Sequence, residues 1–374
     1  MALSKIDVGN MLTGLVPNDN TISRPLSKPI IINGNMAVAQ RGTSFADIGD
    51  GVYSLDRYEA SKNNDGAVTI TQEALTSGNA YTDGFRTALK VDVTTADGTL
   101  AGTQRFLVQQ IVEAQNLQSL KFGTANAEKL TLSFWVKATK TGTHIVRMYQ
   151  YDDDRSASIA YTISTTNTWE KKVMNFPADT TGVIDNNNGH GIQIAWAVGA
   201  GADFQSGTLA TAWAGNTSAN DFVGQVNGLD NTSNNFHLTG IQLEVGEFSS
   251  TTLPPFQHES FADNLQRCQR YFEKRGTVDG NLLANGQAVI NTRGMMFLLC
   301  SQKRAVPSVA FPSAILLTAA NGSAGAVTSS GVTAFSNTGG RFDCNIGSTN
   351  LTVGDATGVQ PSSDTTGLRF DAEL

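Results

Sequence analysis

The sequence is poor in charged residues and has no long apolar run, and each shortage excludes a class of protein. Only 16% of the 374 residues are charged and the net charge is −7, so the chain lacks the basic excess that binding a phosphate backbone requires. No run approaches the roughly 18 apolar residues that span a bilayer, and the first residues lack the apolar core of a signal peptide. We therefore expect no nucleic acid partner, no membrane insertion and no signal-directed export.

Cysteine is also scarce. Cys268, Cys300 and Cys344 stand far apart in the sequence, so neither a zinc cluster nor a disulfide framework is indicated. Free thiols are typical of synthesis in a reducing cytoplasm. The four histidines fit no triad or metal motif, and no Walker loop or dinucleotide fingerprint occurs. The sequence predicts no cofactor and no enzyme; a catalytic site would exist only if folding assembled one.

One acidic run invites a metal interpretation. Asp152, Asp153 and Asp154 follow a predicted strand, and clustered oxygens suit a hard cation such as calcium. The run lacks the spacing of an EF-hand loop, and consecutive carboxylates in a loop are usually solvated. We therefore predict no metal site here.

Gly, Thr, Asn, Ser and Ala are abundant instead, which favours short strands and turns. The clearest strand covers residues 130–138, where apolar and polar residues alternate and an apolar face lies on a core. Trp135 is the misfit on its polar face, so it is either covered by a loop or a neighbouring subunit, or it presents its ring to a ligand. Further strands are expected at 53–58, 68–70, 87–93, 106–113, 144–151, 158–163, 169–176, 191–198 and 236–245. So many strands with almost no helical period between them predict a two-sheet antiparallel sandwich.

The two ends of the chain differ from this pattern. Residues 1–30 are broken by Gly and Pro and predict an arm that only a partner can order. Ser260 begins a predicted helix that runs to about Lys274, and strands follow it. Residues 294–300 show no polar alternation, so this strand is expected to be buried on both faces. A Gly-rich and Ala-rich region of about 100 residues has a meagre core, which favours a homotrimer.

Several strings together resemble a family of bacteriophage virion proteins, the tail-fibre or appendage components with a carbohydrate-binding-module-like jelly roll. The likeness covers about residues 31–275. The strings are Asn-Gly-Asn-Met at 33–36, Ala-Gln-Arg-Gly at 39–42, Leu-Asp-Arg-Tyr at 55–58, Leu-Ser-Phe-Trp-Val-Lys-Ala at 132–138, Thr-Trp-Glu-Lys at 168–171, Thr-Gly-Ile-Gln-Leu-Glu at 239–244 and Cys-Gln-Arg-Tyr-Phe at 268–272.

The resemblance implies a mainly β protein. We expect an N-terminal attachment arm at 1–30, an antiparallel jelly-roll sandwich at 31–258, and one helix with a smaller C-terminal β domain at 259–374. It also implies a virion location in a tail or other surface appendage, a homotrimer, contact with other virion proteins through residues 1–30, and attachment to host surface glycans. A capsid decoration or head-fibre protein and a polysaccharide-degrading enzyme are the alternatives.

Sugar recognition combines an aromatic ring, on which C–H faces stack, with amides and carboxylates that hold hydroxyls. The aromatic candidates are Trp135, Trp169, Trp196, Trp213, Tyr149 and Tyr151. Tryptophans inside strands more often pack, whereas Trp213 lies in a long polar loop where a ligand and an interface are both open. We predict that Trp213 stacks on a sugar while Asn216, Asn220 and Asp221 bind its hydroxyls, with Trp135 as a further candidate.

Overall fold

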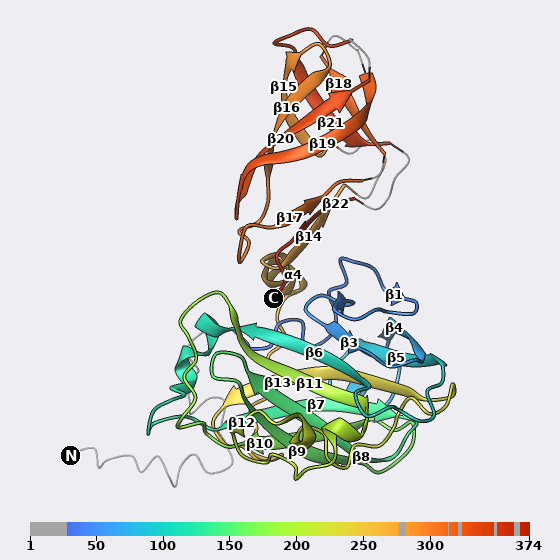
Figure 1. Cartoon of the computed structure of the whole chain (residues 1–374), viewed down its shortest axis with the longest axis vertical. Helices are drawn as coiled ribbons and strands as arrows, with labels where there is room; N and C mark the ends of the chain where they lie inside the picture. Colours follow the sequence, from blue (N-terminus) through green and yellow to red (C-terminus); the bar gives the residue numbers. More distant parts are fainter. Residues whose placement is uncertain (1–27, 277–281, 313, 321–323, 348–349, 363–366) are drawn as a thin grey trace, which may run out of the picture.

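The computed structural model describes residues 28–276, 282–312, 314–320, 324–347, 350–362 and 367–374. Most of the predicted N-terminal arm therefore lies outside the described residues. Two antiparallel sheets form a sandwich, and a smaller barrel stands to one side of it (Figure 1). The predicted jelly-roll sandwich with one helix and a smaller C-terminal β region is confirmed.

The sandwich is built from thirteen strands in two sheets. The six-stranded sheet has the order β1 (Ser44–Phe45), β4 (Ala67–Ala74), β5 (Thr87–Thr95), β13 (Asn235–Val245), β7 (Leu130–Ala138) and β10 (Glu170–Phe176). The seven-stranded sheet has the order β12 (Ala214–Gly215), β9 (Arg155–Ile163), β8 (Gly142–Gln150), β11 (His190–Ala200), β6 (Arg105–Glu113), β3 (Glu59–Lys62) and β2 (Val52–Tyr53).

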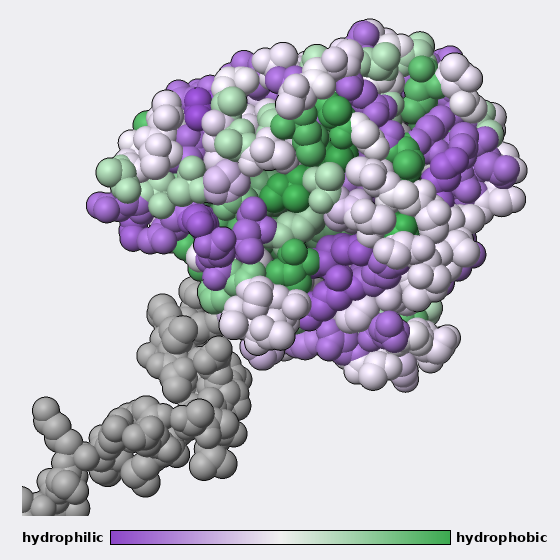
Figure 2. Space-filling model, turned by 90° about the horizontal axis from the view of Figure 1, so that it is seen from below, coloured by the Kyte–Doolittle hydropathy of each residue, from purple (hydrophilic) through white to green (hydrophobic). Residues whose placement is uncertain are grey.

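The alternation in β7 decides how the layers pack. Leu130, Leu132, Phe134 and Val136 are fully buried in the core between the sheets, as period two requires. Phe134 meets the ring of Trp196 from the opposite sheet edge-on, with ring centroids 5.7 Å apart. The side of the sandwich that faces away from the barrel is not uniformly polar, because hydrophobic residues gather in its middle beside hydrophilic ones (Figure 2).

The predicted strand at 53–58 is wrong. β2 ends at Tyr53, a turn follows in which Arg57 has φ 74°, and β3 begins at Glu59. This turn carries the guanidinium of Arg57 into the interior, where the side chain is 1% exposed and donates to the carbonyl of Ile111. The burial of the Arg57 charge beside a fixed acceptor therefore determines the backbone conformation of residues 53–58 more than their strand pattern does.

Short helical segments connect the strands: α3 (Asn79–Thr82), η1 (Ala114–Leu120), η2 (Ala202–Phe204) and η3 (Ser218–Asn220). The predicted helix is α4 (Phe261–Gln269), and Ser260 caps it by accepting from the backbone N–H of Asp263. It ends earlier than the expected Lys274, because β14 (Phe272–Arg275) pairs with β22 (Leu368–Asp371) instead. None of the described helices is long and apolar enough to cross a membrane.

The C-terminal region contains two sheets. A three-stranded sheet of β14, β22 and β17 (Ser308–Ala310) lies beside α4. Beyond it is a closed barrel of β15 (Ala284–Ile290), β16 (Arg293–Leu299), β20 (Gly339–Ile346), β19 (Ala324–Ser336), β18 (Ile315–Ala319) and β21 (Ala356–Pro361). The expectation that residues 294–300 are buried on both faces is wrong. Met296 and Leu298 point into the barrel, while Phe297 and Leu299 are 66% and 72% exposed.

The end of the described chain returns to the sandwich. The hydroxyl of Tyr53 donates to the carbonyl of Leu374 over 2.7 Å, and Arg304 donates to the carbonyl of Glu373 over 2.7 Å. Arg270, at the end of α4, pairs with Glu113 of β6 over 2.6 Å. The C-terminal region is therefore joined to one end of the seven-stranded sheet.

Candidate functional site

The residues predicted to bind a sugar in the loop of residues 199–235 do not form one surface. Trp213 is 8% exposed, donates from Nε1 to the carbonyl of Pro177 over 2.8 Å and packs edge-on against Phe122. Asn220 accepts from the backbone of Thr208. Trp213 thus belongs to the core, which gives it no free face for stacking.

The side chain of Asp221 is bonded by the protein, whereas Asn216 bonds through its backbone. Asn216 is half-buried, and its backbone N–H donates to the carbonyl of Asp154 over 2.8 Å. Asp221 is 1% exposed and accepts from the guanidinium of Arg147. Binding by this group stays a prediction, and we look for a site elsewhere.

Trp135 is partly covered by a loop, and its binding of a ligand stays a prediction. It is half-buried on the outside of the six-stranded sheet, where it packs with Trp169, Phe85 and Phe256. Its Nε1 donates to Asp83 over 3.0 Å.

The three carboxylates of the acidic run after β8 accept hydrogen bonds from other residues of the chain. Asp153 and Asp152 accept from the backbone N–H groups of Val183 and Asp185, over 2.6 and 3.0 Å. Asp154 accepts from the hydroxyl of Tyr149 over 2.8 Å. Within the described part of the chain, no group of three or more His, Cys, Asp or Glu side chains could hold a metal ion.

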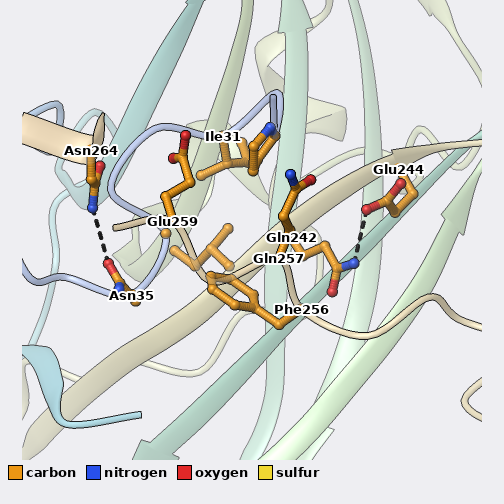
Figure 3. Close-up of a pocket in the computed structure, with 11 residues that line it drawn as sticks. Ile31, Asn35, Gln242, Glu244, Phe256, Gln257, Glu259 and Asn264 are labelled. Carbon is orange, nitrogen blue, oxygen red and sulfur yellow. Dashed lines mark hydrogen bonds between the residues drawn. The ribbon is translucent and has the colours of Figure 1, made fainter. Parts of the chain in front are cut away.

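A pocket lies between β13, the segment before α4 and the first described residues (Figure 3). Phe256 lies beside the amides of Gln242 and Gln257, and Asn264 bonds to Asn35 over 3.2 Å. Its volume of about 20 Å³ holds one or two waters. A sugar ring does not fit, so the chemistry of this pocket is right for a saccharide but its size is not.

The outer face of the seven-stranded sheet is the stronger candidate. Because side chains alternate across a strand, β6, β8 and β11 present every second residue on this face. Over one half of it, the segment of residues 201–228 folds back, and Phe204, Leu209 and Phe222 cover Leu107 and Ile145. The other half is left open between this cover and the C-terminal residues.

Three aromatic rings lie on the open half. Tyr149 ends β8, Tyr151 follows it, and His190 begins β11. The rings of Tyr149 and Tyr151 are 4.8 Å apart at 78°, and those of Tyr151 and His190 are 4.7 Å apart at 40°. Both tyrosines are half-buried and His190 is exposed. We call Tyr149, Tyr151 and His190 the aromatic surface.

Amides and charges hold this surface in place. Gln193 of β11 donates to the hydroxyl of Tyr151 over 3.2 Å and accepts from Arg147 over 2.7 Å. Arg147 also pairs with Asp221, so the cover over the sheet and the aromatic surface share one guanidinium. A site whose side chains are fixed before binding loses less entropy when a ligand arrives.

A second amide and carboxylate lie across the sheet. Gln109 of β6 donates to Glu59 of β3 over 3.0 Å, and the side chain of Glu59 is half-buried. Burial raises the pKa of Glu59, although the hydrogen bond from Gln109 opposes this rise. Gln109 and Gln193 are each 6% exposed, so the half-buried carboxylate of Glu59 and the tyrosine hydroxyls are the groups that this face offers to a ligand.

The tyrosine hydroxyls and the imidazole are neutral at pH 7. Burial, and then the hydrogen bond to the Asp154 carboxylate, raise the pKa of Tyr149 to about 12. Burial and the charge of Glu59 raise the pKa of Tyr151. Burial, followed by the positive charges of Arg304 and Arg57, lowers the pKa of His190. Flat neutral rings beside fixed amides suit the C–H faces and hydroxyls of a sugar better than the chemistry of bond cleavage.

Comparisons with known proteins give only distant likenesses. No protein-family model and no curated protein matches the chain. Among solved structures, it is similar to the enzymatically active domain of bacteriophage CBA120 tailspike protein 4, at 13% identity and a TM-score of 0.30, over 54% of this chain and 21% of that one. The chain thus spans about a fifth of that tailspike structure.

Two carbohydrate-binding modules are matched over nearly their whole length. One is the family 11 module of Clostridium thermocellum Lic26A-Cel5E, at 12% identity and a TM-score of 0.26 over 55% of this chain and 98% of that one. The other is the N-terminal cellulose-binding domain of Cellulomonas fimi β-1,4-glucanase C, at 15% identity and a TM-score of 0.27 over 57% of this chain and 100% of that one. At these TM-scores the likeness carries no argument for function, which has to come from the chain's own residues.

The sequence named Tyr149 and Tyr151 among the aromatic candidates but missed Gln109, Gln193, Glu59 and His190. A spacing of two puts both tyrosines on one side of an extended chain, which was the available signal. The partners come from other strands and lie 39 or more positions away in the sequence, so their position needed the strand order of the sheet.

Proposed function

We propose that the protein binds a saccharide on the outer face of its seven-stranded sheet, without catalysis. The observation that carries this proposal is the aromatic surface itself. Tyr149 and Tyr151 present adjoining rings, and Gln193 fixes one of them through its hydroxyl. Stacking on rings with hydrogen bonds at their edge is the chemistry that sugars require.

The finer proposal is a structural protein of a bacteriophage tail fibre or other virion appendage that attaches to host surface glycans as a homotrimer. The string resemblance over residues 31–275 motivates it. Exposed apolar side chains on the barrel, described below, motivate the trimer, and the apolar residues in the first 30 positions motivate attachment to other virion proteins.

The test is binding of the whole chain to an oligosaccharide array, followed by titration calorimetry on the ligands found. We expect Tyr149→Ala combined with Tyr151→Ala to weaken binding about tenfold to a hundredfold, because each stacked ring contributes on the order of 1 kcal/mol. Tyr149→Phe removes the hydroxyl that donates a hydrogen bond to Asp154 but retains the ring. This variant should bind the saccharide nearly as well as the natural chain.

The matched control is Tyr81→Ala. Tyr81 is half-buried on the other sheet, with the guanidinium of Arg86 4.1 Å from its ring. Its loss should leave binding unchanged, and thermal melting should show that all variants fold. Full binding by the folded double variant would contradict the proposed surface, and loss of binding in Trp135→Ala alone would move the site to the six-stranded sheet.

A further inference from the structure

Arg105 lies on the same outer face as the aromatic surface, and its guanidinium has no hydrogen-bond or ion-pair partner among the described residues. It begins β6 and points to the same outer face as Gln109, because residues four apart on a strand share a face. Its guanidinium lies 4.9 Å from the centre of the Phe204 ring, and the side chain is half-buried. The guanidinium thus lies against Phe204, a residue of the segment that covers part of the sheet.

The other arginines of the sandwich show how unusual this is. Of the six arginines among described residues 28–258, five donate to an acceptor on the protein. Arg41 and Arg57 bond Glu373, Arg86 bonds backbone carbonyls, Arg147 bonds Asp221, and Arg155 bonds Asp179. The guanidinium of Arg105 makes no hydrogen bond or ion pair to any part of the chain that the structure describes. A half-buried cation of this kind retains its whole donor fork for a ligand.

The neighbouring carboxylates that the structure describes bond to other groups and not to Arg105. Asp221 pairs with Arg147, Glu59 accepts from Gln109, and Asp50 accepts from the backbone of Lys62 over 2.7 Å. Burial and the charge of Arg147 lower the pKa of Arg105, while the charges of Asp221 and Asp50 oppose this change.

We propose that the saccharide is acidic and that Arg105 binds its carboxylate. The inference rests on the proposed saccharide surface, because another ring of the same oligosaccharide stacks on Tyr149 and Tyr151. Along β6, Arg105 and Gln109 are about 13 Å apart at the rise of a strand, so the ligand spans more than one sugar. The planar guanidinium fork fits a carboxylate with two parallel hydrogen bonds.

The experiment compares uronate-containing oligosaccharides with the same oligosaccharides after their carboxyl groups are reduced to alcohols. The natural chain should bind the acidic form at least tenfold more tightly, since a charge-assisted hydrogen bond contributes a tenfold to hundredfold factor. Arg105→Gln should abolish that preference and leave binding of the reduced form unchanged. Arg105→Lys retains the charge but not the guanidinium fork, so its preference for the acidic form should lie between those of the natural chain and Arg105→Gln.

Arg86→Gln on the opposite sheet is the matched control and should retain the full preference. A natural chain that binds both forms equally, or an Arg105→Gln chain that still prefers the acidic form, overturns the role of Arg105. In either case, loss of binding in the Tyr149 and Tyr151 double variant shows that the saccharide surface itself stands. Failure of the natural chain to bind either form overturns both proposals.

Discussion

The carboxylate of Glu373 pairs with the guanidinium of Arg57 at the joint between the C-terminal residues and the sandwich. Both side chains are buried, at 5% and 1% exposure, and Arg41 donates to the same carboxylate over 3.2 Å. The ring of Tyr271 lies 3.6 Å from the Arg57 guanidinium. Residues more than 300 positions apart thus share one buried charge network, which fixes the barrel region to the seven-stranded sheet.

Glu373→Gln tests this joint. It leaves the guanidinium of Arg57 without its carboxylate and Arg41 with Asp371 alone, and breaking a buried pair costs about 3–5 kcal/mol. We expect a clear fall in the denaturation midpoint, and faster proteolysis in the C-terminal region. Glu247→Gln is the control, because Glu247 forms an exposed pair with Lys129, and exposed pairs contribute little. Equal midpoints for both variants would show that the joint does not depend on this pair.

His144 gives the folded chain a dependence on pH. It is 1% exposed, and its Nε2 contacts the carbonyl of Lys140 over 3.2 Å. Burial lowers its pKa from 6.5 to about 4. Because the unfolded chain takes up the proton first, the contribution of neutral His144 to stability is complete above pH 6.5 and is lost as the pH falls from 6.5 to about 4. At about 1.4 kcal/mol per unit, the loss is about 3 kcal/mol.

His144→Phe should remove that slope while retaining the stacked packing on Tyr161 and Phe236. The measurement is urea denaturation of both chains at pH 7, 5.5 and 4. We expect the natural chain to lose more unfolding free energy than the variant between pH 7 and pH 4. Parallel curves would mean that His144 takes up its proton without unfolding.

The sequence predicted the sandwich, whereas the tertiary contacts of the candidate site residues could not be predicted from it. A half-buried strand has to alternate, so residues 130–138 showed both its existence and its buried face. The barrel strands Ile315–Ala319 and Ala356–Pro361 were not predicted, because segments of five or six residues are too short to show a clear periodicity. The prediction that Trp213 binds a sugar rested on its polar loop, but its indole N–H donates to the carbonyl of Pro177. Such a contact depends on tertiary folding, which local composition does not encode.

Lys303 and Glu273 form another buried pair, in the C-terminal region. The two side chains are 0% and 1% exposed and lie 2.7 Å apart. Burial raises the pKa of Glu273, but the hydrogen bond and the charge of Lys303 outweigh it, so the pKa is lowered. Glu273 therefore stabilises the fold above the usual pKa of a glutamate, and this contribution is lost as the pH falls.

Lys303→Met should destabilise the C-terminal region by about 3 kcal/mol, since it leaves Glu273 buried without this partner. Combining it with Glu273→Gln should recover part of the loss, because the second change removes the unpaired charge. The measurement is a double-mutant cycle by chemical denaturation. Purely additive losses would show that the two side chains do not interact.

Residues 1–30 are predicted to attach the chain to a virion, and residues 1–27 of this arm can be removed without touching the described structure. They lie outside the described residues, and Arg267 of α4 donates to the carbonyl of Pro29 just after them. Removing residues 1–27 should leave the melting temperature within a degree or two, and it should abolish incorporation into particles, measured by immunoblotting of purified virions. Normal incorporation of the shortened chain would move the attachment surface elsewhere.

Self-association is predicted to use the outside of β16. Phe297 and Leu299 point outward and are 66% and 72% exposed. On the neighbouring strands, Asn285 and Arg341 stand opposite Phe297, so an apolar stripe has polar borders, as the centre of an interface has a polar rim. Exposed apolar side chains gathered on one strand are costly for a single chain, and symmetric copies would cover them.

Phe297→Glu should therefore convert a trimer into a monomer, because burying an unpaired carboxylate in the interface costs several kcal/mol. Sedimentation equilibrium at micromolar concentration measures the mass, and circular dichroism checks that the barrel remains folded. Val183→Glu is the control, since Val183 is 54% exposed on the sandwich and should leave the mass unchanged. A natural chain that sediments as a monomer refutes the trimer, and a trimer that survives Phe297→Glu places the contact on another face.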